Sequence, residues 1–125
     1  MSSVGIRYMI DDVPAAIAFY TTHLGFALDQ DASPAFAAVK RDGVRLLLSG
    51  NTSSGRRPMP DGQEPVPGGW NRLHLQVQDL PAEVAKLKAA GVHFRNEIIS
   101  GPGGSQIVLD DPSGNPVELF QAKTI

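Results

Sequence analysis

The chain has 125 residues and a formal net charge of −2 at pH 7, with acidic and basic residues interspersed. This length suits one compact domain or two small half-domains that share a core, and the weak charge argues against nucleic acid or an anionic membrane as a partner. The absence of cysteine excludes disulfides, cysteine-based zinc sites and a thiol nucleophile.

The N-terminal segment MSSVGIRYMIDD, residues 1–12, lacks a basic region followed by a long apolar region. No apolar run in the chain approaches the ~20 residues needed to span a bilayer. We therefore expect an untargeted, cytoplasmic protein that has no membrane partner.

Residues 8–26, YMIDDVPAAIAFYTTHLGF, are predicted to form a strand that enters a short helix. Asp12 is the expected N-cap, Pro14 lies in the first turn, where a missing N–H costs nothing, and Gly25 stands where the helix ends. Three strand-like runs follow, FALDQD, AFAAVKRDG and VRLLLSG, with turn residues between them. Residues 1–49 are thus predicted to form a βαβββ module.

Residues 50–72, GNTSSGRRPMPDGQEPVPGGWNR, are rich in glycine and proline and show no periodicity. The segment is longer than an ordinary connection, so we predict a linker or lid. Trp70, near its end, is expected either to stack on a flat ligand or to anchor the linker. Arg56 and Arg57 are interpreted as solvated side chains without a role.

The second half repeats the first. Residues 75–94, LQVQDLPAEVAKLKAAGVHF, again place Asp and Pro before an apolar helical stripe and a glycine after it. Three strand-like runs follow here too: VHFRNEII (92–99), SQIVLDDPSGN (105–115) and PVELFQ (116–121). Residues 73–125 are therefore predicted to form a second βαβββ module.

The last run raises a question about Glu118. Strand alternation places Glu118 and Phe120 on one face and Val117 and Leu119 on the other. A carboxylate that faces apolar surroundings is costly unless a cation, a metal or several hydrogen-bond donors compensate it. The sequence therefore predicts a compensating partner for Glu118.

The tandem βαβββ pattern, with HLQVQDLPAEVAKLKAAG (74–91) in one copy and DDPSGNPVELFQ (110–121) at the end, resembles the vicinal oxygen chelate superfamily. That group includes glyoxalase I, extradiol dioxygenases, fosfomycin-resistance proteins and bleomycin-resistance binding proteins. The resemblance implies a single α+β domain over residues 1–125, whose modules form a curled, cup-shaped mixed sheet. It also implies a homodimer, with sites at the module or subunit interface.

The resemblance further implies where metal ligands would lie, in the first and last strands of each module. Those places hold His74 and Glu118 in the second module but Arg7 and Leu46 in the first, so half of the ligand set is present. A guanidinium cannot ligate a cation and repels one. We therefore favour a site without metal, in which Arg7 and Glu118 form an ion pair.

The first functional hypothesis is a metal-free small-molecule-binding protein of the bleomycin-resistance type. An apolar or aromatic ligand would lie in the cup against a few polar groups. The expected ligand-binding residues are Arg7, Met9, Leu46, Leu48, Trp70, His74, Gln76, Glu118 and Phe120.

The alternative hypothesis is an enzyme. In one form, His74 and Glu118 hold Zn²⁺, Fe²⁺, Mn²⁺ or Ni²⁺, and the protein is a glyoxalase-like lyase or an extradiol-type dioxygenase that acts on a vicinal-oxygen substrate. In the other, Glu118 is a catalytic general base without metal, a role that a nearby Arg7 would weaken.

Overall fold

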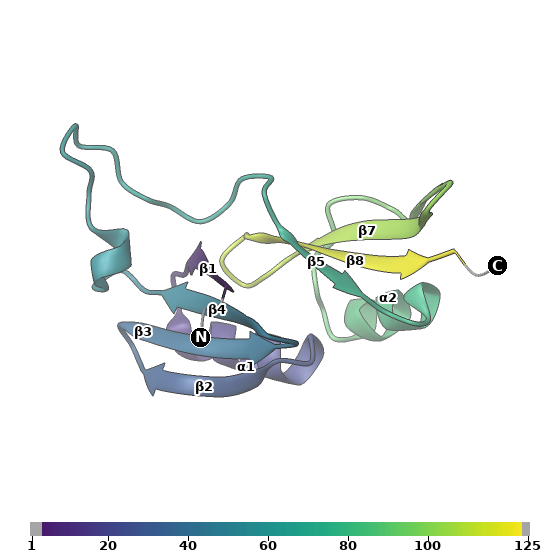
Figure 1. The fold of residues 1–125 in the computed structure, drawn as a ribbon, viewed down its shortest axis with the longest axis horizontal. Helices are drawn as coiled ribbons and strands as arrows, with labels where there is room; N and C mark the ends of the chain where they lie inside the picture. Colours follow the sequence, from purple (N-terminus) through teal and green to yellow (C-terminus); the bar gives the residue numbers. More distant parts are fainter. Residues whose placement is uncertain (1–3, 124–125) are drawn as a thin grey trace. The chain divides into compact units, whose positions relative to one another are not determined.

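The computed structural model describes residues 4–123. The chain divides into two compact units, which separate between Gly68 and Gly69. In the described residues, each unit contains four strands and one α-helix in the order βαβββ (Figure 1). The predicted α+β fold of tandem βαβββ modules is therefore confirmed.

The first unit forms a mixed sheet in the order β1-β4-β3-β2. β1 pairs with β4 in parallel, and the other neighbours are antiparallel. Helix α1 packs against β2, β3 and β4. The elements in chain order are β1 (Val4–Met9), α1 (Val13–His23), β2 (Ala27–Ala32), β3 (Phe36–Arg41) and β4 (Val44–Ser49).

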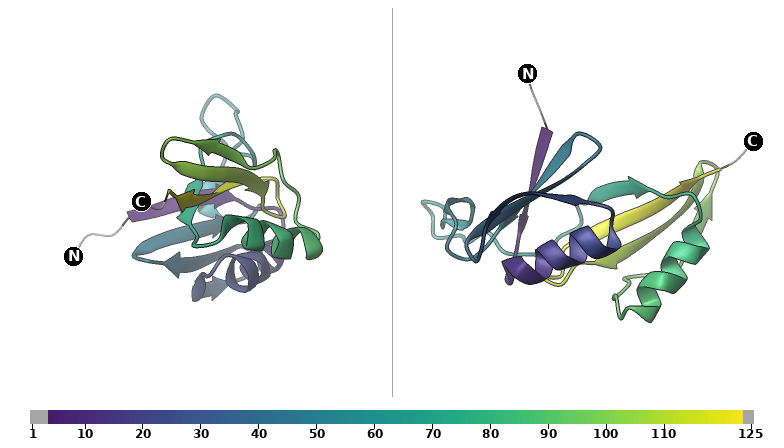
Figure 2. Two further views of the ribbon diagram at one scale, coloured as in Figure 1. Left: turned by 90° about the vertical axis from the view of Figure 1, so that its right-hand side faces the viewer. Right: turned by 90° about the horizontal axis from the view of Figure 1, so that it is seen from below.

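The second unit repeats this topology in the order β5-β8-β7-β6, with β5 parallel to β8. Figure 2 shows each helix lying along one face of its own sheet. The elements in chain order are β5 (Leu73–Gln76), α2 (Leu80–Ala89), β6 (Ile99–Gly101), β7 (Gly104–Asp110) and β8 (Pro116–Ala122).

The two helices begin for the same local reason. The side chain of Asp12 accepts a hydrogen bond from Ala15 N at 3.0 Å, and that of Asp79 accepts one from Ala82 N at 3.1 Å. Each cap satisfies a backbone donor that the helix itself leaves unpaired. A proline follows in the first turn of each helix, so the repeated Asp-x-Pro pattern fixes both starts.

The core of the second unit lies between α2 and the sheet. The buried side chains of α2 are spaced four and three residues apart, so they lie on one face of the helix, and this face packs against the sheet. Neither α1 nor α2, the two α-helices of the described chain, is long and apolar enough to cross a membrane. The buried side chains of this core are Leu73, Leu75, Leu80, Val84, Leu87, Ile107, Leu109, Val117 and Leu119.

The segment expected as a strand at 92–99 differs from the prediction. Only one isolated bridge, Phe94 to Leu109, and the short β6 at its end form ladder contacts. The Asn96 side chain accepts the backbone N–H of Val108 at 2.9 Å, which replaces a backbone partner. A side chain that competes in this way interrupts the ladder, so residues 95–98 lie outside regular strand.

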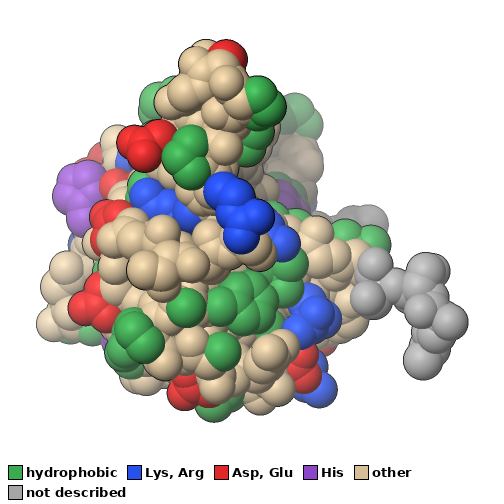
Figure 3. All heavy atoms as spheres, turned by 90° about the vertical axis from the view of Figure 1, so that its left-hand side faces the viewer, with side chains coloured by type: hydrophobic (Ala, Val, Ile, Leu, Met, Phe, Trp, Pro, Cys, Tyr) green, Lys and Arg blue, Asp and Glu red, His purple; other side chains and the backbone are tan. Residues whose placement is uncertain are grey.

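The start of the linker packs on the first unit. A short 3-10 helix, η1 (Ser54–Arg56), ends at Arg56, whose guanidinium donates to Ile10 O at 2.9 Å and to Pro65 O at 3.3 Å. The side chain is only 10% exposed, so the interpretation of Arg56 as a solvated side chain is wrong. Figure 3 shows the loop that follows projecting at the top of the view, with Lys and Arg side chains near its base.

We predict that Gly104→Ala destabilises the fold by about 2 kcal/mol or more, because a positive φ strains other residues and the site is closed. Gly104 has φ +149°, and a Cβ there would collide with the carbonyl oxygen of Gln121 and lie 2.9 Å from Cζ of Phe120. Gly103→Ala is the matched control, since its Cβ meets nothing within 4 Å. Urea unfolding should separate the variants, and equal midpoints would contradict this account.

Candidate functional site

The second sheet has one face covered by α2 and one face that carries polar side chains. Backbone register pairs His74 with Glu118 and Gln76 with Phe120, and it pairs Glu118 with Val108 on the neighbouring strand. Directly paired residues point to the same side of a sheet. These five side chains therefore share the face opposite α2, which we call the open face.

Glu118 is buried, with 11% of its side chain exposed. Its Oε1 atom accepts from Arg72, whose Nε and Nη2 atoms each lie 3.1 Å away. The Nε2 atom of His74 is 3.6 Å from Oε2, beyond ordinary hydrogen-bond range. The cation that compensates Glu118 is thus supplied within the same unit, by a charge-assisted contact.

Arg72 was missed by the sequence analysis, although a signal for it exists. It stands two residues before His74, so strand alternation extended by one step puts it on the same face. Composition assigned it to the glycine- and proline-rich segment instead. The predicted pairing of Glu118 with a cation holds here through Arg72, and the Arg7–Glu118 pair stays a prediction.

Arg7 has its own partner in the first unit. Its Nη1 atom donates to Ser49 Oγ at 2.8 Å. The guanidinium also lies against η1, so closely that a Cβ on Gly55 would be 2.8 Å from Cζ of Arg7. The linker therefore begins by packing against Arg7, and a larger residue at Gly55 would displace the guanidinium.

The placement of Leu46 and Leu48 beside Arg7 needs correction. The register pairs Arg7 with Leu47, whereas Leu46 pairs with Ile6 and Leu48 with Tyr8. Both leucines are fully buried, on the face that holds the core of the first unit. The predicted position in β4 was displaced by one residue, and a displacement of one residue moves a side chain to the other face of a strand. The counterpart of Glu118 in the first unit is therefore Leu47, and Met9 pairs with Ser49.

Two aromatic rings lie together on the open face, toward the C-terminal end of β8. The rings of His74 and Phe120 are 4.8 Å apart at 37° to one another. The His74 side chain is 48% exposed, Gln76 is exposed and Phe120 is half-buried. This end therefore offers ring surface and polar atoms together.

Trp70 lies just before β5 and is 70% exposed. Its carbonyl oxygen accepts from Arg72 Nη1 at 3.3 Å. Its indole ring lies 4.7 Å from the guanidinium carbon of Arg95. Arg95 binds Asp110, which lies two residues after Val108 on β7 and so on the same side of the sheet. The indole therefore adjoins the open face.

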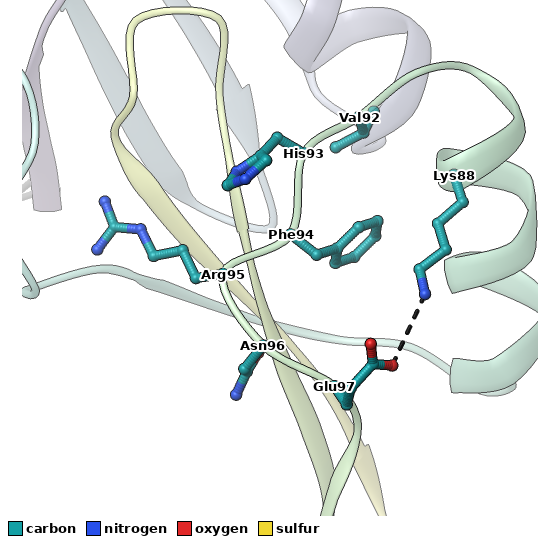
Figure 4. A pocket seen from close by; sticks show the side chains of 7 residues that line it. All are labelled: Lys88, Val92, His93, Phe94, Arg95, Asn96 and Glu97. Carbon is teal, nitrogen blue, oxygen red and sulfur yellow. Dashed lines mark ion pairs between the residues drawn. The ribbon is translucent and has the colours of Figure 1, made fainter.

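A separate hollow of about 360 Å³ lies between the end of α2 and the segment that follows it. Figure 4 shows Phe94 pointing toward Lys88 and Arg95 pointing the other way. Lys88 forms an ion pair with Glu97 at 3.8 Å. The residues that line the hollow are Lys88, Val92, His93, Phe94, Arg95, Asn96 and Glu97.

Comparison with known families adds the deciding observation. Residues 4–119 match the model of the Glyoxalase/Bleomycin resistance protein/Dioxygenase superfamily. The chain belongs to this superfamily. The vicinal oxygen chelate resemblance predicted from the sequence is confirmed. No curated protein matches the chain.

Solved structures of the superfamily fold cover nearly the whole chain. TnmS3, an antibiotic binding protein from Streptomyces sp. CB03234, is 25% identical, with 98% of both chains covered and a TM-score of 0.73. A glyoxalase/bleomycin resistance protein from the same organism is 27% identical, with 96% of this chain and 100% of that chain covered and a TM-score of 0.68. Lactoylglutathione lyase from Agrobacterium tumefaciens, 21% identical with coverages of 96% and 92% and a TM-score of 0.74, shows the fold alone.

Members of the superfamily often bind divalent metals. Stable sites generally use three or more protein ligands. Within residues 4–123, no group of three or more His, Cys, Asp or Glu side chains is suitably placed. His74 and Glu118 supply two ligands, and the guanidinium on Oε1 of Glu118 repels a cation. The described residues of the second unit do not fit a resident metal.

We predict that Arg72→Ala destabilises the protein by about 1–3 kcal/mol, because it leaves a buried carboxylate without its charged donor. Glu118→Gln removes that charge, so the double variant should be less destabilised than the sum of the single variants. Chemical unfolding of the wild type, the two single variants and the double variant gives the coupling free energy between Arg72 and Glu118. Arg57→Ala, an exposed arginine in the linker, is the control, and strict additivity would contradict the pairing.

Proposed function

We propose that this superfamily member is a small-molecule-binding protein that holds an apolar or aromatic ligand on the open face of its second unit, without a resident metal. The observation that carries the proposal is the contact of Arg72 with the Glu118 carboxylate. The guanidinium occupies the carboxylate that the metal-dependent members would need to leave open for coordinating a metal ion. The site is thereby suited to binding and orientation rather than to Lewis-acid chemistry.

The surroundings of this ion pair match a ligand site. Ligand sites combine apolar and aromatic surface with a small number of placed polar groups. Here the half-buried Phe120 supplies apolar surface, and His74 and Gln76 supply exposed polar atoms. The likeness to an antibiotic binding protein at 25% identity supports the same class of function.

The first unit contributes to the proposal only through the family resemblance. We propose Arg7 and Met9 as further ligand-binding residues, and a homodimer as the working assembly. Superfamily members bind small molecules and often form dimers. Both points are expectations for this chain, as is its cytoplasmic location.

The second candidate function is a metal-dependent lyase or dioxygenase. The observation in its favour is that His74 and Glu118 face each other across a parallel pair, with Nε2 and Oε2 3.6 Å apart. A metal bound there would require Arg72 to leave the carboxylate. A general-base role for Glu118 would require the same movement.

Metal content separates the two functions. We expect that protein purified without an affinity tag, incubated with Zn²⁺, Fe²⁺, Mn²⁺ or Ni²⁺ and desalted, retains no ion near stoichiometric amount, because two ligands beside a guanidinium bind weakly. Elemental analysis per chain gives the answer. An ion retained by the native protein and by Glu64→Ala, an exposed linker control, but lost in Glu118→Ala, would overturn the proposal.

Ligand binding is tested by thermal shift with a panel of aromatic and apolar compounds. Compounds that bind the folded state raise Tm, by an amount that grows with the ratio of free ligand concentration to Kd. We expect Arg72→Ala and His74→Ala to weaken the binding of such compounds, while Glu64→Ala leaves it unchanged. A panel that shifts none of these proteins would contradict a binding function.

A further inference from the structure

Trp70 combines high exposure with a fixed position. At 70% exposed, it is the most exposed large hydrophobic side chain among residues 4–123. Such a side chain at a linker end would ordinarily move freely. Here its carbonyl oxygen is held by Arg72, and its ring lies on Arg95.

Arg95 is itself immobilised. Its Nε donates to Asp110 Oδ1 at 2.7 Å, its Nη1 to Gly69 O at 2.8 Å and its Nη2 to Gly114 O at 3.0 Å. The side chain is only 18% exposed. A guanidinium fixed on three sides forms a rigid support, so the indole is ordered before any ligand arrives, and preorganisation lowers the entropic cost of binding.

We propose that the free face of the Trp70 indole is a preorganised stacking site for a planar aromatic compound that is uncharged or anionic, with Arg95 as its positioning residue. This inference rests on the proposed function and names the ligand class of that site. Arg95 covers one face of the ring, and the high exposure of the side chain leaves the other to solvent.

The charge preference follows from the cation behind the ring. A guanidinium over one face of an indole draws on the negative quadrupole of the π system. The opposite face is then less attractive to a second cation, whereas offset stacking with an uncharged or anionic ring remains favourable.

The experiment uses the single tryptophan of the chain. In ¹⁵N-labelled full-length protein, its indole N–H gives one signal, and a ring stacked on it shifts that signal. The probes are 2-naphthoate and (2-naphthylmethyl)trimethylammonium, which carry the same ring and opposite charge. We expect 2-naphthoate to shift the signal saturably and to bind more tightly than the cation.

Two variants assign the effect. Trp70→Leu, at an exposed position, should leave stability nearly unchanged and weaken 2-naphthoate binding, followed by calorimetry, by about three- to tenfold, as expected of an aromatic pair. Arg95→Gln, which removes the cation, should narrow the affinity ratio of the two probes by about two- to fivefold. A purely structural role for Arg95 would weaken both probes equally, and that result would overturn its assignment.

The other outcomes separate this inference from the proposed function. If calorimetry shows 2-naphthoate binding that Trp70→Leu leaves unchanged but Arg72→Ala weakens, the stacking site is wrong and the binding function stands. If aromatic compounds fail in every assay, both fall. If the indole signal moves with protein concentration alone, the ring belongs to an interface between copies of the chain, and the stacking site is overturned.

Discussion

The contact between Arg72 and Glu118 determines what the open face of the second sheet can do. A buried carboxylate requires compensation, and the guanidinium provides it from the residue just before β5 in the same unit. The same arginine holds the carbonyl of Trp70. The Arg72 side chain thus neutralises the Glu118 carboxylate and holds the backbone at Trp70. In this member of the superfamily, the open face is built around an internal ion pair.

The two modules show how a duplicated topology can diverge in chemistry. The first and last strands of each module are parallel neighbours, and register places Arg7 with Leu47 in one and His74 with Glu118 in the other. Each arginine near these pairs finds an oxygen in its own unit: Ser49 Oγ for Arg7 and the Glu118 carboxylate for Arg72. Equivalent backbone positions therefore hold unlike donor sets while the helices and caps remain alike.

The sequence was sufficient for the features that depend on local periodicity. Helix starts at Asp12 and Asp79 and the shared face of Glu118 and Phe120 follow from capping and alternation. It was insufficient where a side chain overrides the pattern: Asn96 interrupts the strand that VHFRNEII predicts, and Leu46 requires a strand register that no single strand reveals. Arg56 was misinterpreted and Arg72 was missed, because linker composition says nothing about which long side chains fold back onto the sheets.

The contacts of Arg56 also have a consequence for where the chain tolerates an insertion. Its guanidinium joins Ile10 O to Pro65 O, so the backbone between Arg57 and Glu64 leaves and returns to nearly the same place. Those eight residues are all exposed. A domain inserted between them would have both of its connections held close together by one buried guanidinium, which makes this loop a natural place for the insertion of a reporter domain.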